Sequence, residues 1–377
     1  MQLSQERLNA KLTYEQRPDG GRVSIAAGAL RGQRVLVTGG SGFIGRHVVS
    51  TLSAAGAAVR VVDLQAHPDP AVDVVRGDIA DPEVVEAAYE GGFDGVVHLA
   101  AVTSVLRSVQ RPELTYQTNV AGTHRVLEGA RAAGVRALVF ASTNAVTGPM
   151  LDPAITERSS LHPLTPYGAT KAAGEMLMSA YTAVYGIRCT SLRLTNVYGL
   201  GMQAKDSIVA RLMRAIRLGG TFEVYGDGLQ VRDYVHVADV VSAMLIALTN
   251  ANWSGPVVIG AGRSLSVLEV IEEVRRVSGA ELPVTHGPAR PGEMPAVIVD
   301  PAYAHGAGWS QQFDFSTGVQ GVWDEWRELE IEGALAFHGA DAPLPLPLAG
   351  GRRKTAAAQA AAGRHAGAAW GVEAGAK

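Results

Sequence analysis

The sequence of 377 residues predicts an α/β fold built on a doubly wound parallel sheet. As far as Gly199, β-branched apolar runs alternate with helical patterns, and this alternation is typical of parallel strands joined by crossover helices. A glycine-rich turn joins the first of these strands to the first helix. After Gly199 the elements become shorter, which indicates a smaller α/β cap over the carboxyl ends of the sheet, where ligands of open α/β folds bind.

Each element of the main sheet has its own boundary signals. Asp81-Pro82 is a helix start and Gly91-Gly92 is a helix stop, and glycine or proline bounds most of the other helices in the same way. We expect strands at about 34–38, 58–62, 73–76, 95–98, 136–141 and 187–193, and helices at about 43–56, 82–90, 113–133 and 166–185.

The composition argues against several classes of protein. A formal net charge of −3 gives no reason to expect nucleic-acid binding. The single cysteine, Cys189, rules out an internal disulfide framework and is expected to be buried, and the ten histidines lack the spacing of metal ligands, so no metal site is expected. Since no apolar run approaches the ~20 residues of a membrane span and the polar N-terminus lacks a signal peptide, we expect a cytoplasmic protein without a membrane partner.

The glycine turn has the pattern of a dinucleotide-binding site in a Rossmann sheet. Gly39 permits a tight turn, Gly42 lets the backbone approach a pyrophosphate, and Gly45 lets the helix pack on the strand. The second strand ends in Asp63, whose carboxylate suits the hydroxyls of an adenosine ribose. Since the two residues after Asp63 cannot pair with a 2′-phosphate, we predict NAD rather than NADP. The alternative is a doubly wound sheet that binds no nucleotide.

Tyr167 and Lys171, one helical turn apart, predict a catalytic base. Thr165 suits the helix cap and Pro166 the first position, so Tyr167 falls in the first turn, where the helix dipole favours negative charge. Lys171 lies on the same face and adds a cation that would lower the phenol pKa from about 10. The alternative is an ordinary helix start with a solvated lysine.

Further motifs accompany these two sites in a fixed order. They are Gly77-Asp-Ile79, His98-Leu-Ala-Ala101, Asn119-Val-Ala-Gly-Thr123, Phe140-Ala-Ser-Thr143, Leu192-Arg-Leu-Thr-Asn-Val-Tyr-Gly199, Tyr225-Gly-Asp-Gly-Leu-Gln-Val-Arg-Asp-Tyr234 and Arg290-Pro-Gly-Glu293. From about residue 34 to residue 326, the chain resembles the extended short-chain dehydrogenase/reductases, and within them the NAD-dependent nucleotide-sugar epimerases and dehydratases. It is most similar to the UDP-glucose 4-epimerase group.

The resemblance implies roles for individual residues. Thr143 would hydrogen-bond the reacting sugar oxygen and help to relay its proton to Tyr167, while Lys171 would lower the pKa of that tyrosine and bind the nicotinamide ribose. NAD would contact Gly39, Gly42, Phe43, Ile44, Gly45, Asp63, Asp78, Ile79, Ala100, Ala101, Asn119, Ser142, Tyr167 and Lys171. The sugar nucleotide would contact Thr143, Tyr167, Asn196, Tyr225, Arg232, Arg290 and Glu293, and the arginines suit its diphosphate.

The implied activity is reversible 4-epimerisation of a UDP-hexose of the UDP-glucose or UDP-galactose type. Hydride and proton leave C4, the transient 4-keto sugar turns over, and hydride returns to its other face. The tightly bound NAD is therefore unchanged overall.

Other activities remain open alternatives. A UDP-glucuronate 4-epimerase is supported by Thr147, which replaces the usual tyrosine and can bond a C6 substituent, and by Lys205, which could supply a cation for the carboxylate. Asn196 argues against this activity, because uronate epimerases tend to have threonine there. A 4,6-dehydratase needs an acidic pair directly after the catalytic threonine, where this chain has Asn144 and Ala145. A UDP-glucuronate decarboxylase and a non-catalytic NAD-binding regulator complete the alternatives.

The sequence also predicts how the chain is divided. Residues 1–31 would form a polar N-terminal extension, 32–199 the NAD-binding domain with the catalytic pair, 200–337 mainly a substrate-binding region with some return to the core sheet, and 338–377 a low-complexity tail that we expect to be disordered. By analogy with related enzymes, the helices at 113–133 and 166–185 would pair across a homodimer interface.

Overall fold

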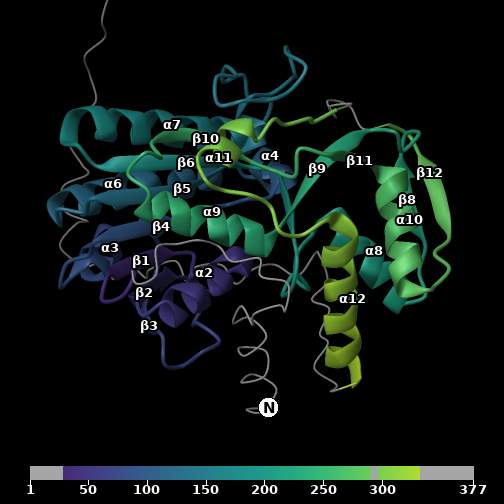
Figure 1. Ribbon diagram of the computed structural model, residues 1–377, viewed down its shortest axis with the longest axis horizontal. Coiled ribbons are helices and arrows are strands. Elements are labelled where there is room, and N and C mark those ends of the chain that lie inside the picture. Colours follow the sequence, from purple (N-terminus) through teal and green to yellow (C-terminus); the bar gives the residue numbers. More distant parts are fainter. Residues whose placement is uncertain (1–28, 290–295, 332–377) are drawn as a thin grey trace, which may run out of the picture. The chain divides into compact units, whose positions relative to one another are not determined.

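Strands and helices alternate through the main sheet of the computed structural model (Figure 1), which describes residues 29–289 and 296–331. The strands predicted from the sequence all form, with small differences at their ends. An additional strand, from the part of the chain after residue 199, joins the same sheet. The sheet consists of β1 (Arg34–Thr38), β2 (Ala58–Asp63), β3 (Asp73–Arg76), β4 (Gly95–His98), β5 (Ala137–Thr143), β6 (Arg188–Leu194) and β10 (Gly255–Ile259).

All pairings in this sheet are parallel, and the strand order is β3-β2-β1-β4-β5-β6-β10. The chain builds outward from β1 in one direction and from β4 in the other, so the predicted doubly wound fold is confirmed. In such a sheet, successive crossovers leave to opposite faces at the boundary between β1 and β4. The carboxyl ends of these two strands are therefore the place where a ligand can bind.

Helices cover both faces of the sheet (Figure 1). On one face lie α2 (Phe43–Ala54) and α9 (Val237–Thr249), and on the other α3 (Pro82–Tyr89), α6 (Thr123–Ala132) and α7 (Pro166–Tyr185). Because successive side chains of a strand point to opposite faces, each strand from β1 to β6 contributes to two apolar cores. Cys189 is buried in the core under α3, α6 and α7, as predicted.

The region 113–133 is more complex than the single helix predicted from the sequence. α4 (Val105–Gln110) and α5 (Pro112–Tyr116) come first, a π-helical turn η1 (Gln117–Gly122) follows, and α6 then continues the chain. The π-helical turn contains Asn119, which is 1% exposed and bonds two other segments of the protein. Since these contacts join segments that are distant in sequence, the helical pattern alone could not predict the turn.

The C-terminal part contains two small sheets and a third apolar core. β7 (Asn196–Tyr198), β9 (Val231–His236) and β11 (Ser264–Ser266) form one sheet, and β8 (Phe222–Tyr225) pairs with β12 (Val284–Gly287) in the other. The third core includes side chains of α8 (Ile208–Arg217), α10 (Val267–Ser278) and α12 (Phe315–Ile331). None of the helices in the described ranges is both long and apolar enough to cross a membrane.

Candidate active site

The glycine turn between β1 and α2 leaves space only for backbone. Gly39 has a φ of 72°, and a Cβ there would lie 2.7 Å from the backbone nitrogen of Ala100. A Cβ on Gly45 would lie 2.1 Å from the carbonyl oxygen of Gly39, so only glycine lets the helix pack this closely. A Cβ on Gly42 would contact just one described atom, at 3.3 Å, and Gly42 is the cap residue of α2. The turn is thus closely packed at Gly39 and Gly45 and more open at Gly42.

The start of α2 is suited to an anion. Among the described residues, no side chain caps its first N–H groups, and its first turn contains no acidic residue. Unpaired N–H groups at a helix start bind anions, and the helix dipole favours negative charge there. Phe43 and Ile44, the first two residues of the helix, carry the backbone groups that would face a pyrophosphate.

The predicted adenosine-binding residues lie just beyond the ends of the neighbouring strands. Asp63 ends β2, and its two carboxylate oxygens accept hydrogen bonds from the backbone nitrogens of Ser41 and Gln65, each at 3.0 Å. Asp78 follows β3 and accepts from the backbone nitrogen of Ala80 at 2.9 Å. Ile79 is buried, so its side chain belongs to the core at this edge.

His98, at the end of β4, is neutral and its tautomer follows from its partners. The Thr123 hydroxyl donates to the carbonyl oxygen of Asn119 (2.6 Å), so its oxygen must accept from Nε2 of His98 (2.9 Å). Nδ1 of His98 then accepts from the hydroxyl of Thr38 (2.6 Å), which itself accepts from the backbone nitrogen of Ala100 (3.2 Å). Burial and the charge of Lys171 lower the pKa of His98 to about 3. The histidine therefore orients the chain around Ala100 and Ala101.

Asn119, predicted to bind NAD, uses its side chain to join two parts of the site. Its Oδ1 accepts from the backbone nitrogen of Val102 (2.8 Å), and its Nδ2 donates to the Val102 carbonyl oxygen and to the hydroxyl of Thr170, both at 3.0 Å. The Thr170 hydroxyl in turn donates to the carbonyl oxygen of Tyr167 (2.9 Å). Asn119 thus fixes the segment after β4 against the start of α7.

The fold brings Thr143 and Tyr167 close together. Thr143 is the last residue of β5, and Tyr167 is in the first turn of α7, where Thr165 caps the helix by accepting from the nitrogen of Gly168 (3.2 Å). The hydroxyl of Thr143 lies near enough to the phenol of Tyr167 to lower its pKa. The backbone nitrogen of Tyr167 also donates to the hydroxyl of Ser108, which belongs to the unpredicted helix α4 (3.1 Å).

The electrostatics of Tyr167 differ from the expectation that a neighbouring ammonium makes it a phenolate. Burial raises the pKa of the Tyr167 phenol to about 12, and the neighbouring Thr143 hydroxyl only partly opposes this effect. Lys171 donates from Nζ to the carbonyl oxygen of Ala141 (2.8 Å) and lies 4.6 Å from the ring centre of Phe140. Burial lowers the pKa of Lys171 to about 7, so its charge near neutral pH is partial.

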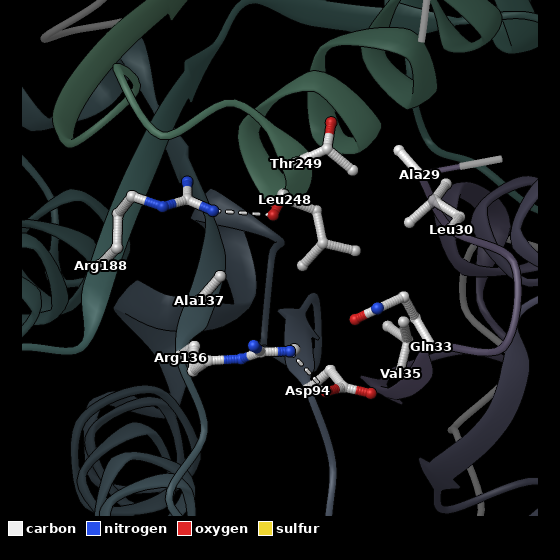
Figure 2. Close-up of a pocket in the computed structure, with 11 residues that line it drawn as sticks. Ala29, Leu30, Gln33, Val35, Asp94, Arg136, Ala137, Arg188, Leu248 and Thr249 are labelled. Atoms are coloured by element: carbon white, nitrogen blue, oxygen red, sulfur yellow. Dashed lines mark hydrogen bonds and ion pairs between the residues drawn. The ribbon is translucent and has the colours of Figure 1, made fainter. Parts of the chain in front are cut away.

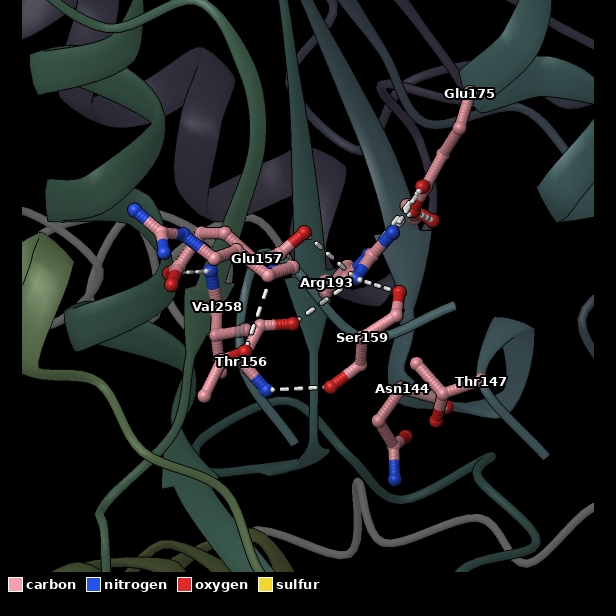
Figure 3. A network of polar contacts seen from close by, with 10 residues as sticks. Asn144, Thr147, Thr156, Glu157, Ser159, Glu175, Arg193 and Val258 are labelled. Atoms are coloured by element: carbon pink, nitrogen blue, oxygen red, sulfur yellow. Dashed lines mark hydrogen bonds and ion pairs between the residues drawn. The ribbon is translucent and has the colours of Figure 1, made fainter. Parts of the chain in front are cut away.

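Glu175 and Arg193 form a buried ionic network that the sequence did not reveal (Figure 3), and Ser142 bonds to it. Its hydroxyl donates to Oε1 of Glu175 (2.5 Å), and the guanidinium of Arg193 forms a two-pronged ion pair with the same carboxylate, the shortest contact being 2.9 Å. Nη1 of Arg193 also reaches three backbone carbonyl oxygens of the segment 156–159. The only sign of this network in the sequence is that α7 and β6 each place a charged residue, Glu175 and Arg193, among apolar residues. The network holds the segment after β5 in place beside the candidate catalytic pair.

Three of the predicted substrate-binding residues lie on the two small sheets. Asn196 is an exposed first residue of β7, and its Nδ2 donates to the carbonyl oxygen of Asp233 (2.8 Å) in β9. Arg232 lies on β9 and Tyr225 ends β8. β7 and β9 pair in parallel, which places Asn196 and Arg232 on adjacent strands. The other two predicted residues, Arg290 and Glu293, lie outside the described residues.

A pocket of about 210 Å³ lies at the amino ends of the strands, opposite to these residues (Figure 2). Arg136 and Arg188 line it, but both are already engaged: Arg136 pairs with Asp94 (2.7 Å), and Arg188 donates to the carbonyl oxygen of Leu248 (2.7 Å). None of the predicted site residues that the structure describes lines this pocket. Its position at the amino edge of a parallel sheet is not where ligands of such folds bind.

Known proteins share both the sequence and the fold of this chain. Residues 35–260 match the NAD dependent epimerase/dehydratase family. The chain is 34% identical over 323 residues to the UDP-glucose 4-epimerase of Streptomyces lividans, covering 80% of this chain and 98% of that protein. The crystal structure of Thermus thermophilus UDP-glucose 4-epimerase in complex with NAD is similar with a TM-score of 0.73 and 36% identity, covering 78% of this chain and 99% of that chain.

A further similar structure is MoeE5 in complex with UDP-glucuronic acid and NAD, with a TM-score of 0.74 and 33% identity over 78% of this chain and 99% of that chain. The matched region includes the glycine turn, Tyr167 and Lys171. The tight turn, the open helix start and Asp63 are also consistent with a bound dinucleotide. The chain therefore belongs to the NAD dependent epimerase/dehydratase family, and NAD is its cofactor.

Proposed function

We propose that the protein catalyses the 4-epimerisation of a UDP-hexose, of the UDP-glucose or UDP-galactose type, through a transient 4-keto sugar. The observation that carries the proposal is the nearness of the Thr143 hydroxyl to the Tyr167 phenol, with Lys171 one turn away on the same helix. The similarity to UDP-glucose 4-epimerases over most of the chain supports the same reaction.

NAD would be held at the carboxyl ends of β1 to β4. The glycine turn and the first N–H groups of α2 would bind its pyrophosphate, while Asp63 and Asp78 would lie at the adenosine. When bound, oxidised NAD supplies the group that accepts and returns the hydride of sugar C4, and a positive charge on its nicotinamide ring.

The protein side chains would handle the proton. Tyr167 takes the proton of the C4 hydroxyl as hydride leaves C4, and Thr143 relays it. Since burial raises the pKa of Tyr167 to about 12 even with the opposing effect of Thr143, its ionisation requires positive charge from Lys171 and from the bound cofactor. The phenol returns the proton to the C4 oxygen once hydride is back on the opposite face, so C4 is inverted without net oxidation.

The sugar nucleotide would be held by residues of the proposed substrate-binding region, 200–337, and by Asn196 just before it. Arg232 and Arg290 would bind the diphosphate, because a guanidinium matches phosphate oxygens in a two-pronged way. Tyr225 would contact the nucleobase and Glu293 its ribose. This arrangement anchors the nucleotide and leaves the hexose free to turn over between the two hydride transfers.

Product analysis tests the proposal directly. Purified protein incubated separately with UDP-glucose, UDP-glucuronate and dTDP-glucose is expected to convert UDP-glucose to UDP-galactose, detected by NMR as inversion at C4. A 6-deoxy-4-keto product would instead indicate dehydration, and a pentose would indicate decarboxylation. If UDP-glucuronate alone is inverted, the hexose assignment is wrong and the uronate alternative, supported by the similarity to MoeE5, replaces it.

The residues after Thr143 disfavour dehydration. Asn144 and Ala145 occupy the positions where an acidic pair would be needed to expel water. Asn144 instead accepts a hydrogen bond from the hydroxyl of Thr143 at 3.4 Å. A carboxamide cannot act as a proton donor or acceptor in catalysis near neutral pH.

We also propose that the protein is a homodimer that pairs through α7 and the preceding helical region. Met176 and Val184, eight residues apart on one face of α7, are 60% and 70% exposed, and Tyr116 of α5 is 51% exposed. Exposed apolar side chains gathered on one helix face indicate an interface. We expect light scattering to give the mass of a dimer and Met176→Glu/Val184→Glu to give a monomer, whereas a monomeric wild-type protein would contradict the proposal.

A further inference from the structure

The segment 199–207, which follows β7, is fastened to both α2 and α12. Arg46 of α2 donates from Nη2 to the carbonyl oxygen of Gly201 (3.1 Å), and Nε2 of His47 bonds the carbonyl oxygen of Leu200 (2.8 Å). Burial lowers the pKa of His47 to about 4, so the imidazole is neutral and donates this bond. The carboxylate of Glu325 in α12 accepts from the backbone nitrogen of Gly201 at 3.0 Å.

The second half of this segment is held by α8. Nη1 of Arg214 donates to the carbonyl oxygens of Gln203 (2.9 Å) and Lys205 (2.8 Å). Backbone carbonyls that are fixed in this way determine the path of the chain, so the side chains between them are presented from a fixed position. The segment thus lies at the first turns of α2, next to the predicted pyrophosphate site.

Three side chains of this fixed segment offer donors that have no acceptor. Nε2 of Gln203 and Oγ of Ser207 are buried atoms without a hydrogen-bond partner in the part of the chain that the structure describes. Nζ of Lys205 lies 4.8 Å from the ring centre of Phe43, and no carboxylate or other acceptor pairs with it within the described residues. Buried polar atoms normally have partners, because leaving them unpaired costs free energy.

The ammonium of Lys205 is placed at the same helix end that suits an anion. Phe43 is the first residue of α2, whose first turn contains no acidic side chain among the described residues. Burial lowers the pKa of Lys205 to about 8, so the ammonium is mostly charged near neutral pH. No counter-ion among the described residues raises this pKa. The one acidic side chain of the segment, Asp206, instead lies 3.9 Å from Arg211.

We infer that the segment 203–207 binds a diphosphate, with Lys205 as its cation and Gln203 and Ser207 as neutral donors. Two diphosphates are available to this site: that of NAD, which the family membership supplies, and that of a sugar nucleotide, which rests on the proposed function. The contact with Phe43 favours the diphosphate of NAD, because the first turn of α2 is where the glycine turn would place it.

Release of NAD from the purified holoenzyme tests this inference without any assay of turnover. We expect Lys205→Met to release NAD at least about tenfold faster than the wild type, since a charge-assisted hydrogen bond is lost. Lys205→Arg keeps the charge and should stay within about threefold. Raising the salt concentration should speed release from the wild type more than from Lys205→Met, because salt screens the lost attraction.

A matched control and a second ligand separate the possible outcomes. Arg136→Met removes one positive charge at the opposite edge of the sheet and should leave release unchanged. Titration of the holoenzyme with UDP identifies the other source: if Lys205→Met weakens UDP binding and leaves NAD release unchanged, the segment binds the sugar nucleotide diphosphate. Ser207→Ala removes a hydroxyl that has no partner among the described residues. It should weaken binding of the same ligand as Lys205→Met does.

Two results would overturn the inference. In the first, the rate of NAD release and the affinity for UDP of Lys205→Met both stay within about twofold of the wild type. An unchanged melting temperature would show that this variant is folded. The other is a defect confined to UDP-glucuronate, which would assign the ammonium to a sugar carboxylate. NAD release and UDP affinity do not depend on which sugar the enzyme inverts, so the product analysis and these two measurements can fail independently.

Discussion

Tyr167→Phe is expected to lower turnover by about 10²–10⁴-fold while NAD remains bound, because the variant keeps the ring and loses the only group proposed to accept the C4 proton. The phenol also lies near the hydroxyl of Thr143, and that threonine retains its contacts with Asn144 and with the backbone nitrogen of Ala145. The arrangement around the missing hydroxyl should therefore persist. Turnover is measured with UDP-glucose, and bound NAD by its release on denaturation.

Tyr185→Phe is the matched control for this experiment. Tyr185 ends the same helix, is 51% exposed, and lies far along α7 from the candidate site. It should be indistinguishable from the wild type in turnover and in bound NAD. Turnover of Tyr167→Phe within about twofold of the wild type would refute the proposed base, and would instead favour a protein whose response to the nucleotide needs no proton transfer.

Glu175→Ala is expected to reduce the free energy of unfolding by about 3–5 kcal/mol, because it leaves the guanidinium of Arg193 buried without its counter-ion. Both side chains are almost fully buried, at 4% and 6% exposure (Figure 3). The same substitution also removes the acceptor of the Ser142 hydroxyl. The measurement is equilibrium unfolding in urea, compared with the wild type.

Glu272→Ala removes a carboxylate from an exposed ion pair and serves as the comparison. Glu272 pairs with Arg275 on α10, and its side chain is 69% exposed, so solvent already screens the pair. Its loss should change the free energy of unfolding by less than about 1 kcal/mol. Equal losses in the two variants would show that the Glu175–Arg193 pair contributes no more than a surface pair. If Glu175→Ala does not fold, Glu175→Gln provides the same comparison with the hydrogen bonds partly retained.

The parts of the fold that local chemistry determines could be predicted from the sequence. α7 begins and ends where the sequence predicts, because Thr165 caps it, Pro166 suits its first position, and Gly186 ends it with a φ of 71°. The glycine turn was predictable for the same reason, since Gly39 needs a positive φ and Gly45 a close backbone contact. The approach of Thr143 to Tyr167 then follows from a parallel sheet whose carboxyl ends share one edge.

The parts that depend on distant contacts could not be predicted. The π-helical turn forms around Asn119, whose partners Val102 and Thr170 lie in other elements. The pKa values of Tyr167 and Lys171 depend on burial, which the spacing of the two residues does not reveal. Lys205 could not be placed from the sequence, because its contact with Phe43 results from the path of a segment fastened to two other helices.

The side chain of Asn119 connects two halves of the site by hydrogen bonds. One end holds both backbone groups of Val102, directly after the residues proposed to line the cofactor, and the other holds Thr170, which bonds the carbonyl oxygen of Tyr167. A shift of either half therefore displaces the other. In the proposed reaction, the geometry of hydride transfer and that of proton transfer would in this way be linked through a single carboxamide.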